Sequence, residues 1–250
     1  MRVCVLRPDY ATSQVDYQHY DPRRDLSALL PQAQVDHLFL NKLTTYKQLK
    51  ESAKNQYDIY VNLCEGYLEW EVPSIDVIHS LELLNLPYTG PNALLYDPSK
   101  ELMKYVAYTQ HVQTPAYKLI REESDISLVA TTLQFPLFIK PAKAGDSLGI
   151  DTNSLVRTEA ELRTKVQQIL PEYGSLLAEQ YIDGPEFTVM LAKNAGTNTV
   201  TVYDPIEYRF PEGNSFKTYA LKTSELHTDA NVLVTDIDLK ERLKQAAEAI

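Results

Sequence analysis

Residues 135–150, with the sequence FPLFIKPAKAGDSLGI, constrain the fold more than any other stretch of the chain. An apolar run ends on Lys140 and a proline, and a short loop that contains Gly145 and Gly149 follows at once. This order predicts a buried strand that presents Lys140 at its end, beside a flexible loop. Loop glycines let backbone N–H groups approach an anion closely, and a neighbouring lysine can pair with phosphate. Taken alone, the stretch is more simply an ordinary strand and surface turn, because its spacing fits neither a Walker loop nor a dinucleotide fingerprint.

The composition narrows the class of protein. With 250 residues, of which 44% are hydrophobic, the chain can bury a sizeable core in one large domain or a few small ones. A net charge of -10 disfavours nucleic acid as a partner, although a few lysines and Mg²⁺ can still neutralise ATP. No apolar run is long enough to span a bilayer, so we expect a cytoplasmic protein without membrane partners.

The cysteines and histidines predict neither a disulfide framework nor a metal site. Cys4 and Cys64 are the only cysteines, and each lies in an apolar, strand-like run where a reduced core thiol is expected. The histidines show no spacing typical of metal ligands, and no metal is assigned to His19, His37, His79, His111 or His227.

The first ninety or so residues alternate between strand-like and helix-like patterns. Residues 3–6, 35–40 and 58–63 read as strands, and residues 45–54 as a polar helix. A further helix is expected after Ser74, a candidate N-cap, with an apolar face formed by Ile75, Ile78 and Leu81. This alternation predicts a parallel sheet covered by helices, which the breakers at residues 86–91 bring to an end.

The rest of the chain predicts an α+β region followed by a largely antiparallel sheet. A helix is expected over residues 98–111, capped by Asp97, with a buried stripe of Leu102, Met103, Val106 and Ala107. A capping box at residues 158–161 opens another helix, whose apolar side is Leu162, Val166 and Leu170. Strands are expected at residues 176–181, 187–192 and 199–203, with 217–221 as a further candidate.

Residues 238–250 predict an amphipathic helix that ends on Ile250 without a glycine, asparagine or basic residue to cap it. This favours a chain that is cut inside a domain. The alternative is a natural terminus that frays.

Several short motifs follow one another in a fixed order: NLCEG (62–66), PYTG (87–90), SK (99–100), TP (114–115), FPLFIKP (135–141), GDSLG (145–149), EQYIDG (179–184) and PEFT (185–188). In combination they resemble the ATP-grasp superfamily and, more narrowly, the D-alanine–D-alanine ligases. The resemblance covers roughly residues 58–225. It implies an α/β protein with a Rossmann-like pre-ATP-grasp domain at residues 1–95. A two-part α+β ATP-grasp domain would follow, with a lid at 96–173 and a core at 174–250 that is incomplete at its C-terminus. ATP would bind between lid and core.

The resemblance also implies roles for the residues that would hold the phosphates of ATP. Lys100 and Lys140 match the two nucleotide-binding lysines of the family, although Lys100 alone could be a solvated helix lysine. Lys222 falls where the family places a further phosphate lysine, and together with the Ser147 hydroxyl it would be catalytic. The loop over the terminal phosphate would be formed by Gly145, Asp146, Ser147 and Gly149.

The remaining roles concern adenosine, substrate and metal. By the same resemblance, Glu179, Gln180 and Ile182 would hold adenine, the last two through their backbone groups, and Glu186 would bind the ribose hydroxyls. Glu65 follows a strand's carboxyl end, where open α/β sheets bind ligands, and is a candidate for substrate binding or a plain turn residue. The family's Mg²⁺ ligands are expected beyond residue 250. Residues 7–13, RPDYATS, lack the usual substrate loop, which leaves the substrate open. In the phosphate loop Asp146 replaces a common serine, and its carboxylate would repel a triphosphate unless Mg²⁺ or a lysine such as Lys143 intervenes.

The function that the resemblance implies is an ATP-dependent carboxylate–amine ligase. It would form an amide or peptide bond through an acyl phosphate, with an amino acid or short peptide as substrate. Its partners would be small-molecule carboxylates and amines, with a homodimer possible, and the 250-residue chain alone is expected to be inactive. The alternative is a non-catalytic ATP-grasp-like protein that binds nucleotide or acts as a scaffold.

Overall fold

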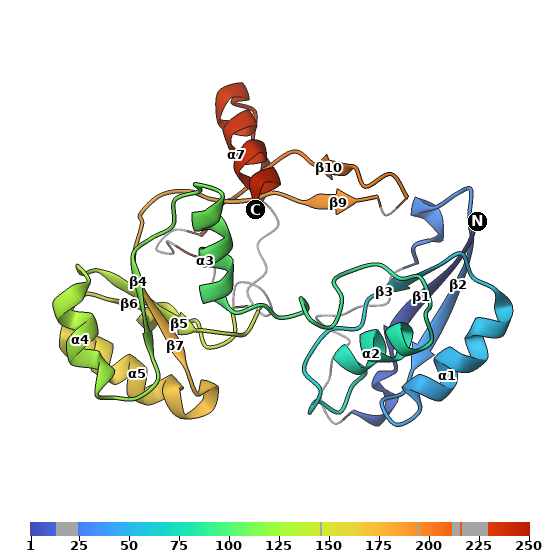
Figure 1. Cartoon of the computed structure of the whole chain (residues 1–250), viewed down its shortest axis with the longest axis horizontal. Coiled ribbons are helices and arrows are strands. Elements are labelled where there is room, and N and C mark those ends of the chain that lie inside the picture. Colours follow the sequence, from blue (N-terminus) through green and yellow to red (C-terminus); the bar gives the residue numbers. More distant parts are fainter. Residues whose placement is uncertain (14–24, 146, 195, 212–215, 217–229) are drawn as a thin grey trace. The chain divides into compact units, whose positions relative to one another are not determined.

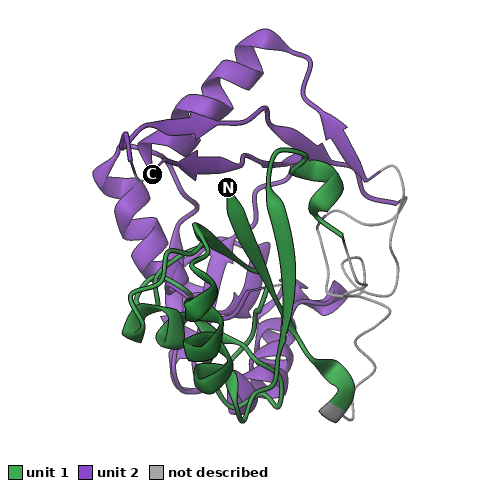
Figure 2. Ribbon diagram, turned by 90° about the vertical axis from the view of Figure 1, so that its right-hand side faces the viewer, with its two compact units in different colours: residues 1–96 green, residues 97–250 purple. Residues whose placement is uncertain are grey.

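The structure is a computed structural model that describes residues 1–13, 25–145, 147–194, 196–211, 216 and 230–250. The chain divides into two compact units, Met1–Tyr96 and Asp97–Ile250, which Figure 2 shows in different colours. The first unit ends one residue past the domain boundary predicted at residue 95. The predicted division into lid and core falls inside the second unit and stays a prediction.

The first unit contains a three-stranded parallel sheet, as the alternating patterns predict. Its regular elements are β1 (Arg2–Pro8), β2 (Gln34–Leu40), α1 (Thr45–Ser52), β3 (Ile59–Asn62) and α2 (Ile75–Leu83). The strand order is β2-β1-β3, so β1 pairs with both neighbours. Short 3-10 turns lie at Tyr10–Thr12, Ser27–Leu29 and Ala53–Asn55.

The core of this unit lies between β1 and the two helices. Cys4 and Leu6 of β1 share one face of the sheet and pack with Leu49 of α1 and Leu81 of α2. Both helices therefore cover that face, as Figure 1 shows. Cys4 and Cys64 are buried free thiols, as the sequence predicts.

Ser74 precedes α2, as predicted, but its side chain does not cap the helix. Its hydroxyl donates to the Tyr67 carbonyl oxygen at 2.7 Å, and its N–H donates to Asp76 Oδ1 at 2.8 Å. Asp76, in the first turn, therefore accepts the N–H of the N-cap residue, while the Val77 N–H donates to the Ser74 carbonyl oxygen and not to its side chain.

The second unit opens with a four-stranded antiparallel sheet of order β4-β7-β5-β6. Its elements are α3 (Lys100–Thr109), β4 (Tyr117–Ile120), α4 (Asp125–Thr132), β5 (Leu137–Pro141), β6 (Leu155–Val156), α5 (Glu159–Tyr173) and β7 (Leu176–Gln180), with a 3-10 turn at Thr152–Ser154. The predicted strand ending at Lys140 is β5, and the strand expected at residues 176–181 is β7. Both are central strands.

The two faces of this sheet have different environments, because alternate residues of a strand point to opposite sides. Leu137 and Ile139 of β5 and Ala178 of β7 are fully buried in one core with α4 and α5, which lie together against that face (Figure 1). Phe138 and Lys140 of β5 project to the other face. Glu179 of β7, the register partner of Phe138, projects to that second face as well.

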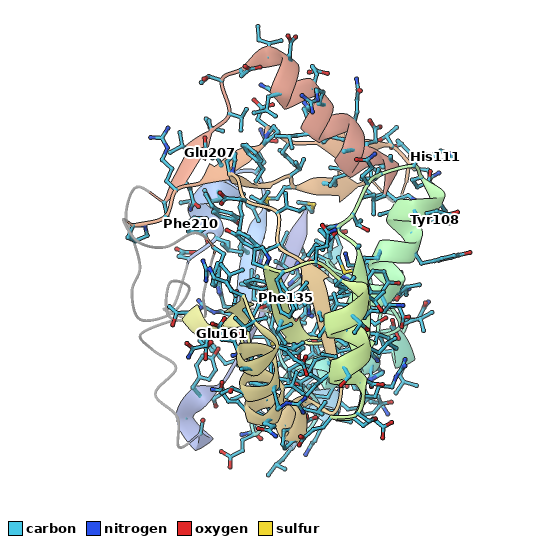
Figure 3. The ribbon with its side chains drawn as sticks, turned by 90° about the vertical axis from the view of Figure 1, so that its left-hand side faces the viewer. Tyr108, His111, Phe135, Glu161, Glu207 and Phe210 are labelled. Atoms are coloured by element: carbon cyan, nitrogen blue, oxygen red, sulfur yellow. The ribbon has the colours of Figure 1, made fainter. Side chains whose placement is uncertain are left out.

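The helix α3 differs from its predicted form at its start and in its buried face. It begins at Lys100, and the Ser99 hydroxyl, not Asp97, caps it by accepting the Leu102 N–H at 3.1 Å. Leu102 and Met103 are 45% and 53% exposed, and the buried residues are Lys104 and Ala107. Tyr108, near its end, extends into solvent (Figure 3). The predicted apolar stripe is therefore wrong in its first half.

The helix α5 follows its prediction closely. Thr158 accepts the Glu161 N–H at 3.2 Å, while Glu161, in the first turn (Figure 3), accepts from the N–H of Arg157. The cap is therefore not the reciprocal box that the sequence predicts. The apolar side of α5 packs into the core as expected.

The final part of the second unit is antiparallel, as predicted. Its elements are β8 (Glu186–Thr188), β9 (Leu191–Lys193), β10 (Val200–Val202), β11 (Ile206–Tyr208), β12 (Asn231–Leu233) and α7 (Ile237–Ala249). They form a sheet of order β12-β11-β8 and a hairpin of β9 and β10, so the single strand expected at residues 187–192 is split in two. The candidate strand at 217–221 lies outside the described residues. Every helix in the described ranges is too short or too polar to cross a membrane.

Gly149 closes the loop after β5 against the sheet and yields a first prediction. A Cβ at this position would lie 2.9 Å from Pro141 Cγ and 3.1 Å from Tyr173 Cε2, and its φ is +72°. We expect Gly149→Ala to lower the free energy of unfolding by roughly 1–3 kcal/mol, because both the contacts and the backbone become strained. Gly145→Ala is the matched control, since a Cβ there meets nothing within 4 Å. Urea denaturation measures both variants, and equal midpoints would contradict the packing assigned to Gly149.

Candidate functional site

A buried carboxylate lies at the centre of the four-stranded sheet. Glu179 is on β7, and its register partners are Tyr117 on β4 and Phe138 on β5. Its side chain is on the face opposite the α4–α5 core, yet the residue is only 8% exposed. A buried carboxylate is costly unless charged or polar partners surround it. Its partners therefore determine the arrangement of this face.

Two lysines from different elements bind the two oxygens of Glu179. Lys140, two residues after Phe138 on β5, forms an ion pair with Oε1. Lys104 of α3 donates to Oε2 at 2.8 Å and to the Pro115 carbonyl oxygen at 3.0 Å. We call Lys104, Glu179 and Lys140 the lysine–glutamate triad. Two ammonium groups and one carboxylate give the triad a net charge of +1.

The two lysines also set the ionisation of the glutamate. Burial by itself would raise the pKa of Glu179, but the charge of Lys140 and the hydrogen bonds from both lysines bring that pKa below its ordinary value. Glu179 therefore remains a carboxylate near neutral pH.

Lys100, one turn before Lys104 on α3, ties that helix to the loop after β5. Its N–H donates to the Ala142 carbonyl oxygen at 2.9 Å, and its Nζ donates to the Ala144 carbonyl oxygen at 2.7 Å. Burial and the nearby charge of Lys140 lower the pKa of Lys100 below its ordinary value. The structure thus brings Lys100, Lys140 and the glycine-containing loop together.

The loop itself is built from two consecutive turns. The Leu148 N–H donates to the Gly145 carbonyl oxygen at 3.1 Å, and the Ile150 N–H donates to the Ser147 carbonyl oxygen at 3.0 Å. Ala144 has a φ of 100° and Ser147 a φ of 59°, conformations that non-glycine residues rarely adopt and that are common at functional sites. Asp146 lies outside the described residues, as does Lys222.

The segment predicted to hold adenosine runs from β7 into β8. The Gln180 N–H donates to the Ala116 carbonyl oxygen at 2.9 Å. Ile182 is 69% exposed in the connecting segment. Glu186 begins β8, opposite Tyr208 of β11. The ribose and adenine roles of these residues stay predictions.

Aromatic rings lie beside the triad. The Phe138 ring stacks with Tyr181 at a centroid distance of 6.4 Å and meets Phe216 edge-on at 4.8 Å. Lys140 Nζ lies 5.9 Å from the centre of the Phe138 ring. A positive charge and an apolar aromatic surface are therefore adjacent on one face of the sheet.

Glu65 belongs to the first unit and follows the carboxyl end of β3, as predicted. Its side chain is exposed. The next residue, Gly66, has a φ of +123° and donates its N–H to the Tyr96 hydroxyl at 2.7 Å. The role of Glu65 in substrate binding stays a prediction.

Lys104 is the residue of this site that sequence reasoning missed. A signal was available, because Lys100, Lys104 and Ala107 follow one another at helical spacing of four and three residues. They therefore share one side of α3. A lysine on the buried side of a helix is rare unless it is paired, and so it predicts a carboxylate opposite.

Solved structures show which fold this is. The VanG D-Ala:D-Ser ligase from Enterococcus faecalis matches with a TM-score of 0.64 at 14% identity, covering 99% of this chain and 81% of that one. The D-alanine–D-alanine ligase from Bacillus anthracis, in complex with ATP, gives a TM-score of 0.61 at 19% identity, covering 100% and 76%. The chain therefore has the mixed α/β architecture of the ATP-grasp ligases, as the resemblance implies.

Sequence comparison identifies the family. The family model described as "D-ala D-ala ligase C-terminus" matches residues 103–250. The D-alanine–D-alanine ligase of Pseudomonas fluorescens (strain Pf0-1) is 35% identical over 111 residues, which are 44% of this chain and 33% of that protein. The Pseudomonas putida (strain GB-1) ligase is 34% identical over 115 residues, 45% and 35% of the two chains. The chain belongs to the D-Ala–D-Ala ligase C-terminal family, and its matches span about a third of the length of these curated relatives.

The triad makes a prediction about stability and pH. Glu179→Gln leaves two buried ammonium groups side by side, so we expect it to lower the free energy of unfolding at pH 7 by about 3 kcal/mol. Because the folded pKa of Glu179 is lowered, the stabilisation is complete above the unfolded pKa of about 4.3 and is lost as the pH falls through the folded pKa. The difference between wild type and variant should therefore shrink at acid pH.

Urea denaturation at a series of pH values measures this difference. Glu172→Gln, at an exposed glutamate of α5, is the control and should show no such trend. A stability difference for Glu179→Gln that does not shrink as the pH falls well below about 4.3 would contradict the ion pairing of Glu179.

Proposed function

We propose that this chain carries the nucleotide-binding part of an ATP-dependent carboxylate–amine ligase. The observation that carries the proposal is the meeting of Lys100 and Lys140, from α3 and β5, at one glycine-containing loop. Each ammonium group has three donor hydrogens, and the described contacts use one acceptor for each of the two lysines. Both lysines can therefore still donate to phosphate oxygens. The net positive triad favours a polyphosphate at this place.

The aromatic surface beside the triad suits a nucleobase. Phe138, Tyr181 and Phe216 offer apolar ring faces and edges on which adenine can stack. The Gln180 carbonyl can accept from the adenine amino group, and the Ile182 N–H can donate to the ring. Glu186 would take the ribose hydroxyls.

The reaction of such a ligase has two steps. A substrate carboxylate oxygen attacks the γ-phosphorus of ATP and releases ADP, which leaves an acyl phosphate. An amine then attacks the acyl carbon, and phosphate departs as the amide forms. In this chain Lys100 and Lys140 would orient the phosphates, and the loop at 145–149 would exclude water while Ser147 donates its hydroxyl hydrogen. Lys222 is proposed as a further phosphate lysine.

Mg²⁺, when bound with ATP, would neutralise phosphate charge. Among the described residues, however, no group of three or more His, Cys, Asp or Glu side chains could hold a metal ion. The substrates are proposed to be amino acids or short peptides, because the relatives are named as D-Ala–D-Ala and D-Ala:D-Ser ligases. The proposal also includes a cytoplasmic location and small-molecule carboxylates and amines as partners. A homodimer remains an option within it.

Phosphate release tests the ligase activity. We expect the full-length protein to release phosphate from ATP only when a suitable pair of amino acids is present, since a carboxylate is needed to form the acyl phosphate and an amine is needed to release phosphate from it. A colorimetric phosphate assay with amino-acid pools, including D-alanine and D-serine, measures this. Tight ATP binding without stimulation by any pair would instead support the non-catalytic alternative.

The phosphate anchor can be tested by comparing two lysines. Lys140 is held by β5 and Glu179, whereas Lys143 is exposed in the loop and must be ordered on binding. We expect Lys140→Ala to weaken ATP binding by about 1.5–3 kcal/mol, the range for a hydrogen bond to a charged group. The matched control Lys143→Ala should lose less than half as much. Titration calorimetry measures both, and an equal or larger loss for Lys143 would show that the anchor is assigned to the wrong lysine.

A further inference from the structure

The ammonium group of Lys104 is enclosed by the protein. It donates to Glu179 Oε2 at 2.8 Å and to the Pro115 carbonyl oxygen at 3.0 Å, and it lies 5.0 Å from the centre of the Tyr117 ring. Its side chain is 10% exposed. These partners account for its charge and its donors, so Lys104 is not placed to contact a ligand itself.

Glu179 connects this enclosed lysine to the more open one. Each carboxylate oxygen takes one ammonium group, with Lys104 on Oε2 and Lys140 on Oε1. A glutamate side chain has three rotatable bonds, and the hydrogen bond from Lys104 restricts them. The position of the Lys140 ammonium group is therefore determined in part by a residue on another element.

The net charge of the lysine–glutamate triad also depends on Lys104. With Lys104, the triad carries one net positive charge, so Lys140 can still attract phosphate. Without Lys104, Glu179 and Lys140 form a neutral pair, and a phosphate must compete with the carboxylate for a single ammonium group. The loss of the Lys104 charge should therefore weaken nucleotide binding more as the number of phosphates in the nucleotide rises.

We propose that Lys104 is a positioning residue for nucleotide binding: by holding the second oxygen of Glu179 it fixes Lys140 and keeps the triad positive, without touching the nucleotide. This rests on the proposed function, because it assumes that Lys140 binds phosphate. A purely structural lysine would instead act on folding alone.

The test compares the affinities of AMP, ADP and ATP, as magnesium complexes, for the full-length protein and its variants by titration calorimetry. We expect Lys104→Met to raise the Kd of ATP about tenfold or more and that of AMP less than threefold, with ADP between them. Lys104→Arg keeps the charge and should bind ATP within about threefold of wild type. The control is Lys42→Met, since Lys42 is also largely enclosed and pairs with Asp76 at 2.6 Å, but in the other unit.

Lys104→Gln provides a second variant if the methionine variant does not fold. Glutamine retains a donor for the Glu179 carboxylate but lacks the charge, so the same graded loss is expected. Equal losses for AMP and ATP, or unchanged ATP binding by a folded Lys104→Gln, would overturn the inference. Failure of the wild-type protein to bind any of the three nucleotides would overturn the proposed function, and the inference with it.

Discussion

The burial of one carboxylate governs the second unit. Glu179 lies in the central part of the sheet, where an unpaired negative charge would cost several kcal/mol. It is satisfied only because α3 brings Lys104 to one oxygen while β5 brings Lys140 to the other. This requirement sets the rotation of α3 about its axis. Turning Leu102 and Met103 inward instead would carry Lys104 away from its partner.

The same rotation has a consequence for the loop after β5. Lys100 lies one helical turn before Lys104 on α3, so the rotation of α3 that buries Lys104 also directs Lys100 to the carbonyl oxygen of Ala144. A single helix thus holds a buried structural cation and a cation at the loop. The contacts that fix α3 therefore also place the group that is proposed to meet phosphate.

Elements whose form depends on residues close in sequence were predicted correctly. The apolar run before Lys140 gave the correct strand, and the alternating elements near the N-terminus gave the correct parallel sheet. The buried face of α3 was predicted wrongly, because helical periodicity alone does not reveal that Lys104 must face the buried carboxylate of Glu179. Short elements such as β4, β11 and β12 were missed because their partners are distant in sequence. The proposed roles of Lys100 and Glu186 came from motif order, not from spacing.

Net charge is a poor guide to a site of this kind. The chain carries a charge of -10, yet the sheet face with Phe138 and Lys140 is locally positive. Charges on the surface are screened beyond about 8–10 Å at physiological salt, whereas ammonium groups held in a partly buried cluster are screened much less. The potential that a phosphate meets is therefore set by a few fixed side chains. A negative net charge therefore does not prevent this face from attracting an anion.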